Sequence, residues 1–134
     1  MRGFTLIELM VVVVVLAILL AIGYPTYLDQ VRKARRSDAT AGLMETAQRL
    51  ERCFTDSNSF NATGCPSGTV TSPEGYYNIA IVATATTYTL TATPASGTTQ
   101  AGDSKCAKFT LDQTGTRGAQ DAGGTDTTGT CWNN

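Results

Sequence analysis

The hydrophobic pattern divides the chain near Pro25. From Phe4 to Tyr24 most side chains are apolar, and none is polar between Leu9 and Ile22. A helix of about 20 such residues, rising about 1.5 Å each, is long enough to cross a hydrocarbon core of about 30 Å. The pattern therefore predicts one membrane-spanning helix over residues 4–25.

The next segment, residues 26–54, has the pattern of an amphipathic helix. Its apolar side chains recur at nearly helical spacing: Tyr27, Val31, Ala34, Ala39, Leu43, Ala47, Leu50 and Phe54. Charged side chains occupy the other face, where Glu45 and Arg49 are spaced for an i,i+4 ion pair. Pro25 lacks an N–H and is expected to kink the helix near Ile22. We therefore expect one long helix, apolar all round in its first half and amphipathic in its second.

Polar and strand-like patterns fill the rest of the chain. Residues 55–75 are rich in Ser, Asn, Thr, Gly and Pro, and are predicted to form an irregular loop. Alternation of apolar and polar positions predicts strands over 77–81, 87–93 and 107–111, with a turn at 112–115 and a weak fourth strand over 116–119. The expected fold class is α+β, in which the long helix packs on a small antiparallel sheet of three to four strands within residues 76–119.

Composition and charge narrow the function classes. The 134 residues contain no histidine, which is the commonest general base, and their formal net charge is −1. The sequence shows no nucleophile paired with a base, no cluster with metal-ligand spacing and no phosphate-binding loop. We therefore expect no enzyme activity, no catalytic residue, and no metal or other cofactor. Nucleic acid is not expected as a partner, because a charge near zero supplies no attractive field.

Four cysteines indicate covalent links in the second half. Only about 80 residues remain for a globular head, and domains of this size gain from disulfides, which form in oxidising compartments. Four cysteines allow three connectivities. We expect Cys53 with Cys65 and Cys106 with Cys131, because both pairs close local loops. The second pair would bound a C-terminal region, residues 106–131, and tether its Gly- and Thr-rich tail.

One carboxylate interrupts the apolar stretch. Glu8 lies in the first turns of the predicted span, where a charge costs less than the roughly 3 kcal/mol of a central position but still favours a cationic partner. Apart from Arg2, no Lys or Arg lies within one or two helical turns. We therefore expect the partner on another chain. Such a pair would fix the registry of neighbouring helices, since the attraction in a buried pair barely offsets desolvation.

The residues Arg2-Gly3-Phe4-Thr5-Leu6-Ile7-Glu8-Leu9 resemble the class III signal peptide of type IV pilins and of type II secretion pseudopilins. In that family a prepilin peptidase cleaves after the glycine and methylates the new amine. The resemblance implies a leader of residues 1–3, cleavage between Gly3 and Phe4, and N-methylation of Phe4. It also implies a cation for Glu8, namely the Phe4 amine of a neighbouring subunit.

Later segments resemble the PilE-type minor pilins of Gram-negative bacteria: residues 35–39, 47–52, 88–94, 111–115 and 131–132. The resemblance implies a structural, minor subunit of a type IV pilus, which supports pilus biogenesis and hence adhesion and twitching motility. It implies a periplasmic head of residues 26–134 behind an inner-membrane helix, and later a place in the cell-surface pilus. Other pilin subunits, the prepilin peptidase and the inner membrane are the implied partners. By the same resemblance, the region 106–131 would be exposed and mediate contacts.

Several alternatives remain open. A secretory signal peptide could end at residues 21–23, and a plain membrane anchor would have a similar apolar run, but neither explains Glu8. A type II secretion pseudopilin would share the N-terminal chemistry. A receptor or DNA-binding subunit at a pilus tip would rely on Lys105, Lys108 and Arg117. The basic cluster of residues 32–36 is expected to be a solvated helix face near anionic headgroups, or a contact between subunits.

Overall fold

The computed structural model describes residues 3–133, which form two compact units that meet between Val31 and Arg32. The long helix α1 (Leu6–Ser57) belongs to both units. The remaining elements lie in the second unit, which we call the head. In chain order they are β1 (Gly68–Thr71), β2 (Tyr77–Ala83), β3 (Tyr88–Pro94), the 3-10 helix η1 (Thr99–Gly102), β4 (Lys108–Asp112), β5 (Arg117–Gln120) and the short helix α2 (Thr128–Cys131).

The first unit is the apolar part of α1. Its side chains are exposed along the whole stretch from Leu6 to Tyr24, as expected for a surface that faces lipid or other helices. α1 is the helix among the described residues that is long and apolar enough to cross a membrane. It continues through Pro25, and the Thr26 hydroxyl donates to the Ile22 carbonyl oxygen at 3.4 Å. The predicted kink near Ile22 stays a prediction.

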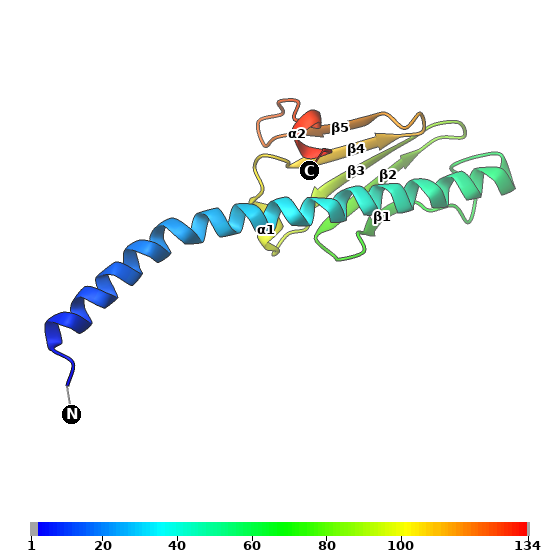
Figure 1. Cartoon of the computed structure of the whole chain (residues 1–134). Coiled ribbons are helices and arrows are strands. Elements are labelled where there is room, and N and C mark those ends of the chain that lie inside the picture. Colours follow the sequence, from blue (N-terminus) through cyan, green and yellow to red (C-terminus); the bar gives the residue numbers. More distant parts are fainter. Residues whose placement is uncertain (1–2, 134) are drawn as a thin grey trace. The chain divides into compact units, whose positions relative to one another are not determined.

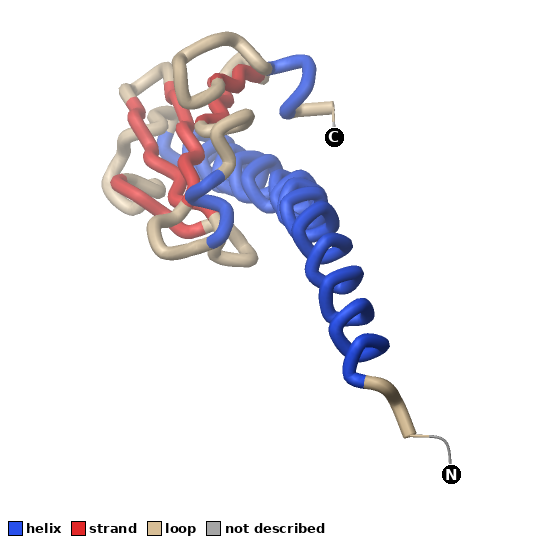
Figure 2. Tube along the Cα trace, turned by 90° about the vertical axis from the view of Figure 1, so that its left-hand side faces the viewer, coloured by secondary structure: helices blue, strands red, loops and turns tan. Residues whose placement is uncertain are grey.

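The head is an antiparallel meander covered by the second half of α1. The strands pair in chain order, β1-β2-β3-β4-β5, and the sheet lies along one side of the helix in Figures 1 and 2. Inward-facing side chains of the strands and of the helix make one core: Ala39, Leu43, Ala47, Leu50, Tyr77, Ile79, Ile81, Tyr88, Leu90, Ala92, Phe109, Leu111 and Ala119. The predicted α+β fold with a helix over a small antiparallel sheet is confirmed.

Details of the elements differ from the sequence-based expectation. The sheet has five strands, because residues 68–71 of the predicted loop pair with β2 from Gly68 opposite Ile81 to Thr71 opposite Asn78. At the N-terminal end of the predicted apolar face, Tyr27 and Ala34 are exposed. The buried face of α1 starts at Arg36 and includes Gly42, where a Cβ atom would lie 2.6 Å from Ile79 Cδ1. This close approach explains a glycine in the middle of a helix.

Two disulfides close the head. Cys53 is joined to Cys65 across 12 positions, and Cys106 to Cys131 across 25 positions, the pairing expected from the sequence. The first bond ties the C-terminal end of α1 to the following loop. The second ties the segment before β4 to α2, and both of its cysteines are buried.

Candidate assembly site and head contacts

Glu8 takes part in a capping box at the start of α1. The Thr5 backbone N–H and hydroxyl each donate to Glu8 Oε2 at 3.0 Å, and the Glu8 N–H donates to Thr5 Oγ1 at 3.3 Å. This reciprocal pattern satisfies backbone donors that a helix N-terminus otherwise leaves unpaired. The sequence analysis missed this role, although the spacing Thr5-x-x-Glu8 is the signature of a capping box. The predicted pair between Glu8 and a neighbouring subunit involves a second chain and stays a prediction.

The expected cleavage site lies just before this box. Gly3 and Phe4 are exposed and precede the helix, and the Phe4 side chain is 89% exposed. Met1 and Arg2, the rest of the predicted leader, lie outside the described residues. The cleaved bond would therefore be in non-helical backbone, while methylation of Phe4 remains a prediction.

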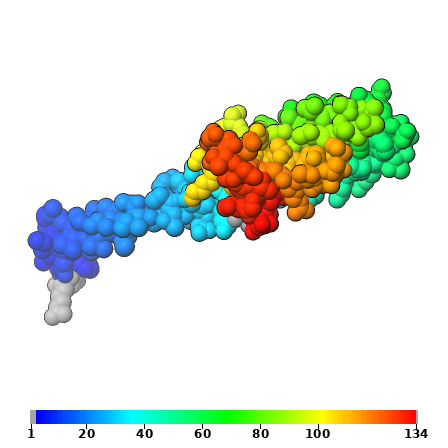
Figure 3. Space-filling model, turned by 90° about the horizontal axis from the view of Figure 1, so that it is seen from above, coloured from blue at the N-terminus to red at the C-terminus, as the bar shows by residue number. Residues whose placement is uncertain are grey.

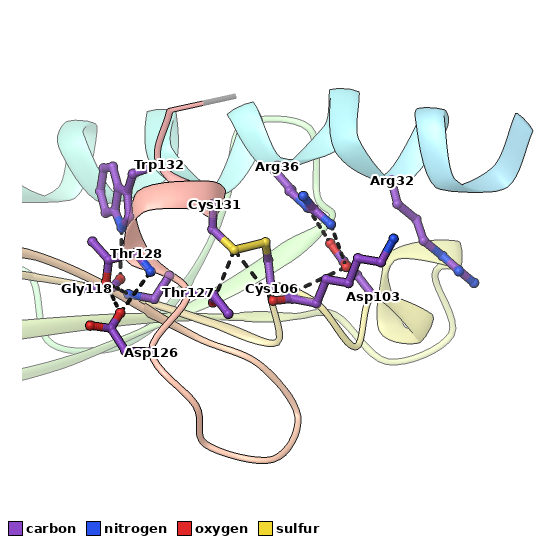
Figure 4. The surroundings of a disulfide bond; sticks show 12 residues. Arg32, Arg36, Asp103, Cys106, Gly118, Asp126, Thr127, Thr128, Cys131 and Trp132 are labelled. Carbon is purple, nitrogen blue, oxygen red and sulfur yellow. Dashed lines mark hydrogen bonds and ion pairs between the residues drawn. A yellow bond between two sulfur atoms is a disulfide. The ribbon is translucent and has the colours of Figure 1, made fainter. Parts of the chain in front are cut away.

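A buried ion pair joins α1 to the connection between β3 and β4. We call residues 95–106 of this connection the strap. Arg36 donates from Nε to Asp103 Oδ2 at 2.7 Å and from Nη2 to Asp103 Oδ1 at 2.9 Å, and both residues are buried (Figure 4). Two parallel charge-assisted bonds of this kind fix the geometry of the contact closely. No motif in the sequence marks Asp103, and the sequence analysis missed it.

Gln100 of the strap adds a second buried contact to the helix. Its Nε2 lies 3.2 Å from the Arg32 carbonyl oxygen, 2.7 Å from the Tyr77 hydroxyl and 3.1 Å from Asp103 Oδ2. Gln100 Oε1 is buried without a hydrogen-bond partner. Burial raises the pKa of Tyr77 above its usual range, because the phenolate would lose its hydration. The phenol therefore stays neutral in this cluster.

Asp38 makes a third buried connection, between α1 and the turn from β1 to β2. Its carboxylate accepts hydrogen bonds from the Ser72 hydroxyl, from the Glu74 N–H at 2.8 Å and from the Tyr76 N–H at 3.1 Å. Three donors on one buried carboxylate compensate for its lost hydration. Asp38 therefore holds the turn against the helix.

Most side chains of the basic cluster, residues 32–36, contact other residues of the head. Besides the ion pair of Arg36, Arg32 Nε donates to the Thr99 carbonyl oxygen at 3.3 Å, and Arg35 contacts the Thr99 hydroxyl and stacks over the Tyr76 ring at 4.3 Å. Lys33 is exposed. The expectation of a solvated helix face is therefore wrong for Arg36, because Asp103 and the strap cover it.

The C-terminal region covers the outer edge of β5. The Thr127 N–H donates to the Ala119 carbonyl oxygen at 2.9 Å, and Trp132 Nε1 donates to the Gly118 carbonyl oxygen at 2.8 Å. The Trp132 ring packs edge to face on Phe109, with 6.1 Å between the centroids. Figure 3 shows this segment in red beside the strands in orange. The tail is thus held by hydrogen bonds, an aromatic contact and a disulfide.

Of the basic residues proposed for a receptor role, Lys108 and Arg117 line one pocket beside β5, and Lys105 lines a separate pocket. Lys105 is exposed, Lys108 is half-buried at the start of β4, and the Arg117 guanidinium lies over the Trp132 ring at 5.1 Å. The nearby carboxylates of Asp112 and Asp126 accept hydrogen bonds from residues of their own turns. Hydrogen bonds from Thr114 and Thr128 hold the pKa values of Asp112 and Asp126, respectively, below their usual range.

Tyr88 provides a pH-dependent contribution to head stability. Burial, together with the hydrogen bond from its hydroxyl to Glu51 Oε1 at 3.1 Å, raises the pKa of Tyr88 to about 12. The unfolded chain would release this proton near pH 10, so the stabilisation is complete below about pH 10 and is lost as the pH rises towards 12. We expect denaturant midpoints of the head to fall over this range, and to fall less in Tyr88→Phe. An equal fall in both proteins would contradict the assignment.

Comparison with known proteins identifies the protein family to which this chain belongs. A family model for the prokaryotic N-terminal methylation motif matches residues 1–24, and a model described as "Type IV minor pilin ComP, DNA uptake sequence receptor" matches residues 25–110. The second match covers more than half of the chain. The chain therefore belongs to the type IV minor pilin family that this model describes. The resemblance to type IV pilins drawn from the sequence is confirmed.

Individual relatives agree with this family. The chain is 40% identical over 75 residues to prepilin peptidase-dependent protein D of Escherichia coli K12, covering 52% of this chain and 51% of that protein. It is 41% identical over 69 residues to the fimbrial protein of Moraxella nonliquefaciens, covering 47% and 45%, and 34% identical over 62 residues to type II secretion system core protein G of Pectobacterium carotovorum, covering 46% and 40%. The match thus spans about half the length of these relatives.

A solved structure supports the fold. The non-core minor pilin PilV of Neisseria meningitidis superposes with a TM-score of 0.57 over 72% of this chain and 93% of that one, at 24% identity. The shared architecture is a long N-terminal helix with an antiparallel sheet, which is the pilin fold.

Proposed function

We propose that this chain is a structural, minor subunit of a type IV pilus. The observation that carries the proposal is the combination, in one chain, of an apolar helix that matches the N-terminal methylation motif and a disulfide-closed pilin head. The helix anchors the subunit in the inner membrane with the head in the periplasm, and later packs among the helices of other pilin subunits. The oxidising periplasm suits both disulfides. The subunit has no catalytic role and needs no metal or cofactor.

Maturation by a prepilin peptidase precedes assembly in this proposal. The peptidase cleaves between Gly3 and Phe4 and methylates the Phe4 amine. That amine then pairs with Glu8 of a neighbouring subunit, which replaces the capping box as the main partner of the carboxylate. Because both charges lose water when helices pack together, the pair fixes the stagger of the helices more than it adds stability.

Mass spectrometry of the N-terminus tests the proposal directly. Pili would be sheared from cells that express the native chain, and the subunit identified by its head peptides. We expect a mature N-terminus at Phe4 that carries one methyl group. Recovery of the chain as a soluble protein trimmed after Gly23, with no apolar helix, would contradict both the membrane anchor and the assembly.

A pseudopilin of type II secretion is the first alternative, because one relative is a core protein of that system. The N-terminal chemistry would be the same, so the location decides. Detection in sheared surface pili favours the pilus subunit, whereas deletion that blocks protein secretion and leaves pili intact favours the pseudopilin.

A receptor for DNA is the second alternative, because the matching family model bears that description. Lys105, Lys108 and Arg117 are the residues to examine, since phosphate contacts release counterions and make affinity fall steeply with salt. A Lys105→Gln, Arg117→Gln double variant should bind DNA more weakly. The slope of log affinity against log salt concentration should become shallower by about 2, since about one unit of slope is lost with each phosphate contact. The matched control is Arg49→Gln, which removes an exposed charge of α1 paired with Glu45. Equal binding by both variants would exclude these side chains as the contacts.

A further inference from the structure

The contacts of the strap fall on a single turn of α1. Thr99, Gln100 and Asp103 bond to the helix between Arg32 and Arg36, and two of these bonds involve the backbone oxygen and the side chain of Arg32 itself. Gly102 lies so close to Arg32 that a Cβ atom would be 2.5 Å from Arg32 Nη2. This turn is also the first turn of α1 that belongs to the head.

The strap is itself fixed at several points along its length. At its start the Ala95 N–H donates to the Tyr76 carbonyl oxygen at 2.8 Å. Farther along, the Ser104 carbonyl oxygen accepts from the Ala122 N–H at 2.9 Å, and Cys106 donates its N–H to Asp103 Oδ1 at 3.3 Å and carries the disulfide to Cys131. Figure 4 shows this disulfide next to the ion pair of Arg36 and Asp103. The strap can therefore resist a pull from the helix.

The turn that the strap holds is intrinsically weak as a helix. Arg32, Lys33, Arg35 and Arg36 place four positive charges within five residues, and like charges at i,i+3 and i,i+4 destabilise a helix. On the N-terminal side of this turn, Gly23 and Pro25 also weaken the helix. Glycine is unfavourable inside a helix, and Pro25 has no N–H to donate to the carbonyl of Ala21. Fraying that begins near Pro25 and spreads along the helix would therefore reach this turn of like charges where the head begins.

We propose that the strap is a clamp that keeps Arg32–Arg36 helical and sets Arg32 as the limit of any unwinding of α1. Asp103 neutralises one of the repelling charges, and Gln100 and Thr99 hold the backbone and side chain of Arg32. Residues 6–31 can then bend or unwind when other proteins bind them, while the part of the helix that packs on the sheet stays intact. The clamp is a property of the head alone, so it stands or falls independently of the pilus assignment.

Hydrogen exchange of the full chain in detergent micelles tests the clamp. In Asp103→Asn, Arg36 loses its charged partner, and we expect amides in peptides covering residues 32–36 to exchange at least about tenfold faster than in the native chain. Peptides from residues 43–57 and 77–94 should keep their protection. The matched control is Asp112→Asn, which removes a carboxylate of the turn between β4 and β5 and should leave residues 32–36 unchanged.

Unchanged exchange at residues 32–36 in Asp103→Asn would overturn the proposal. If that variant instead lost protection throughout the head, Gln100→Met would decide, because it removes the bond to the Arg32 carbonyl oxygen and retains the ion pair. Faster exchange confined to residues 32–36 in Gln100→Met supports the clamp. No local change, or a loss of protection spread over the whole head, rejects it.

Discussion

Replacing Glu8 with glutamine is expected to remove the subunit from pili while its head stays folded. The carboxylate lies at the start of an apolar helix, where an unpaired charge is costly. In the proposed assembly it pairs with the Phe4 amine of a neighbouring subunit only when the two helices have the correct stagger. Glutamine keeps an oxygen that can accept the bonds from Thr5, so the capping box can persist, but it carries no charge. The variant thus separates the two roles of this side chain. We expect at least about a tenfold smaller share of the subunit in sheared pili, measured by immunoblot against the cell pool.

Two control variants sharpen this test. Thr5→Val removes the hydroxyl of the capping box and keeps the charge of Glu8, so it should enter pili far better than Glu8→Gln. Glu45→Gln removes a carboxylate from the exposed Glu45–Arg49 pair, which has a small effect in solvent, and should enter normally. If Thr5→Val were lost from pili as completely as Glu8→Gln, helix capping and not charge pairing would be the requirement at this site.

The sequence was informative where one physical signal dominates. An apolar run as long as residues 9–22 has few structural solutions, and the periodic face from Ala39 to Leu50 needs a sheet to cover it. The strands from Tyr77 to Pro94 show clear alternation, so the strands and their buried faces could be anticipated. The cysteines were paired correctly because short loops are the simplest to close.

The sequence was silent where the structure depends on single polar residues. Asp38, Gln100 and Asp103 sit at no recognisable spacing, and they act only because distant segments meet around them. Arg36 looked like part of a solvated cluster for the same reason. Strand β1 was missed because its four residues lie in a stretch of turn-forming residues and bury little, so pairing with β2 decides its conformation.

The apolar core and the buried polar contacts of the head have different roles. The aromatic and aliphatic core holds the sheet against residues 39–54 of α1, whereas Asp38, Asp103 and Gln100 fix the helical segment that precedes Ala39. Hydrophobic contacts are non-directional, and hydrogen bonds to charged groups are directional. The core therefore supplies stability, and the polar residues fix the position of the helix where it enters the head.

Truncation of Phe109 to alanine is expected to cause the largest loss of stability in the head. Phe109 is fully buried on β4, and its ring meets the Tyr77 ring at 5.8 Å and the Trp132 ring at 6.1 Å, edge to face in both cases. Removing a buried phenylalanine side chain typically costs about 3 to 5 kcal/mol, from lost burial and from the cavity left behind. The loss should be near the upper end, because two aromatic contacts disappear with the ring.

Denaturant unfolding of the full chain in micelles measures this loss, with the fluorescence of Trp132, the single tryptophan, as the probe. The midpoint should fall with little change in slope, since the same surface is exposed on unfolding. The control is Val82→Ala on β2, whose side chain is 68% exposed and should contribute within about 0.5 kcal/mol. A Phe109→Ala head as stable as the control would mean that Trp132 and the disulfide Cys106–Cys131 hold the C-terminal region without the core beneath them. The aromatic cluster would then be a consequence of that attachment and not its cause.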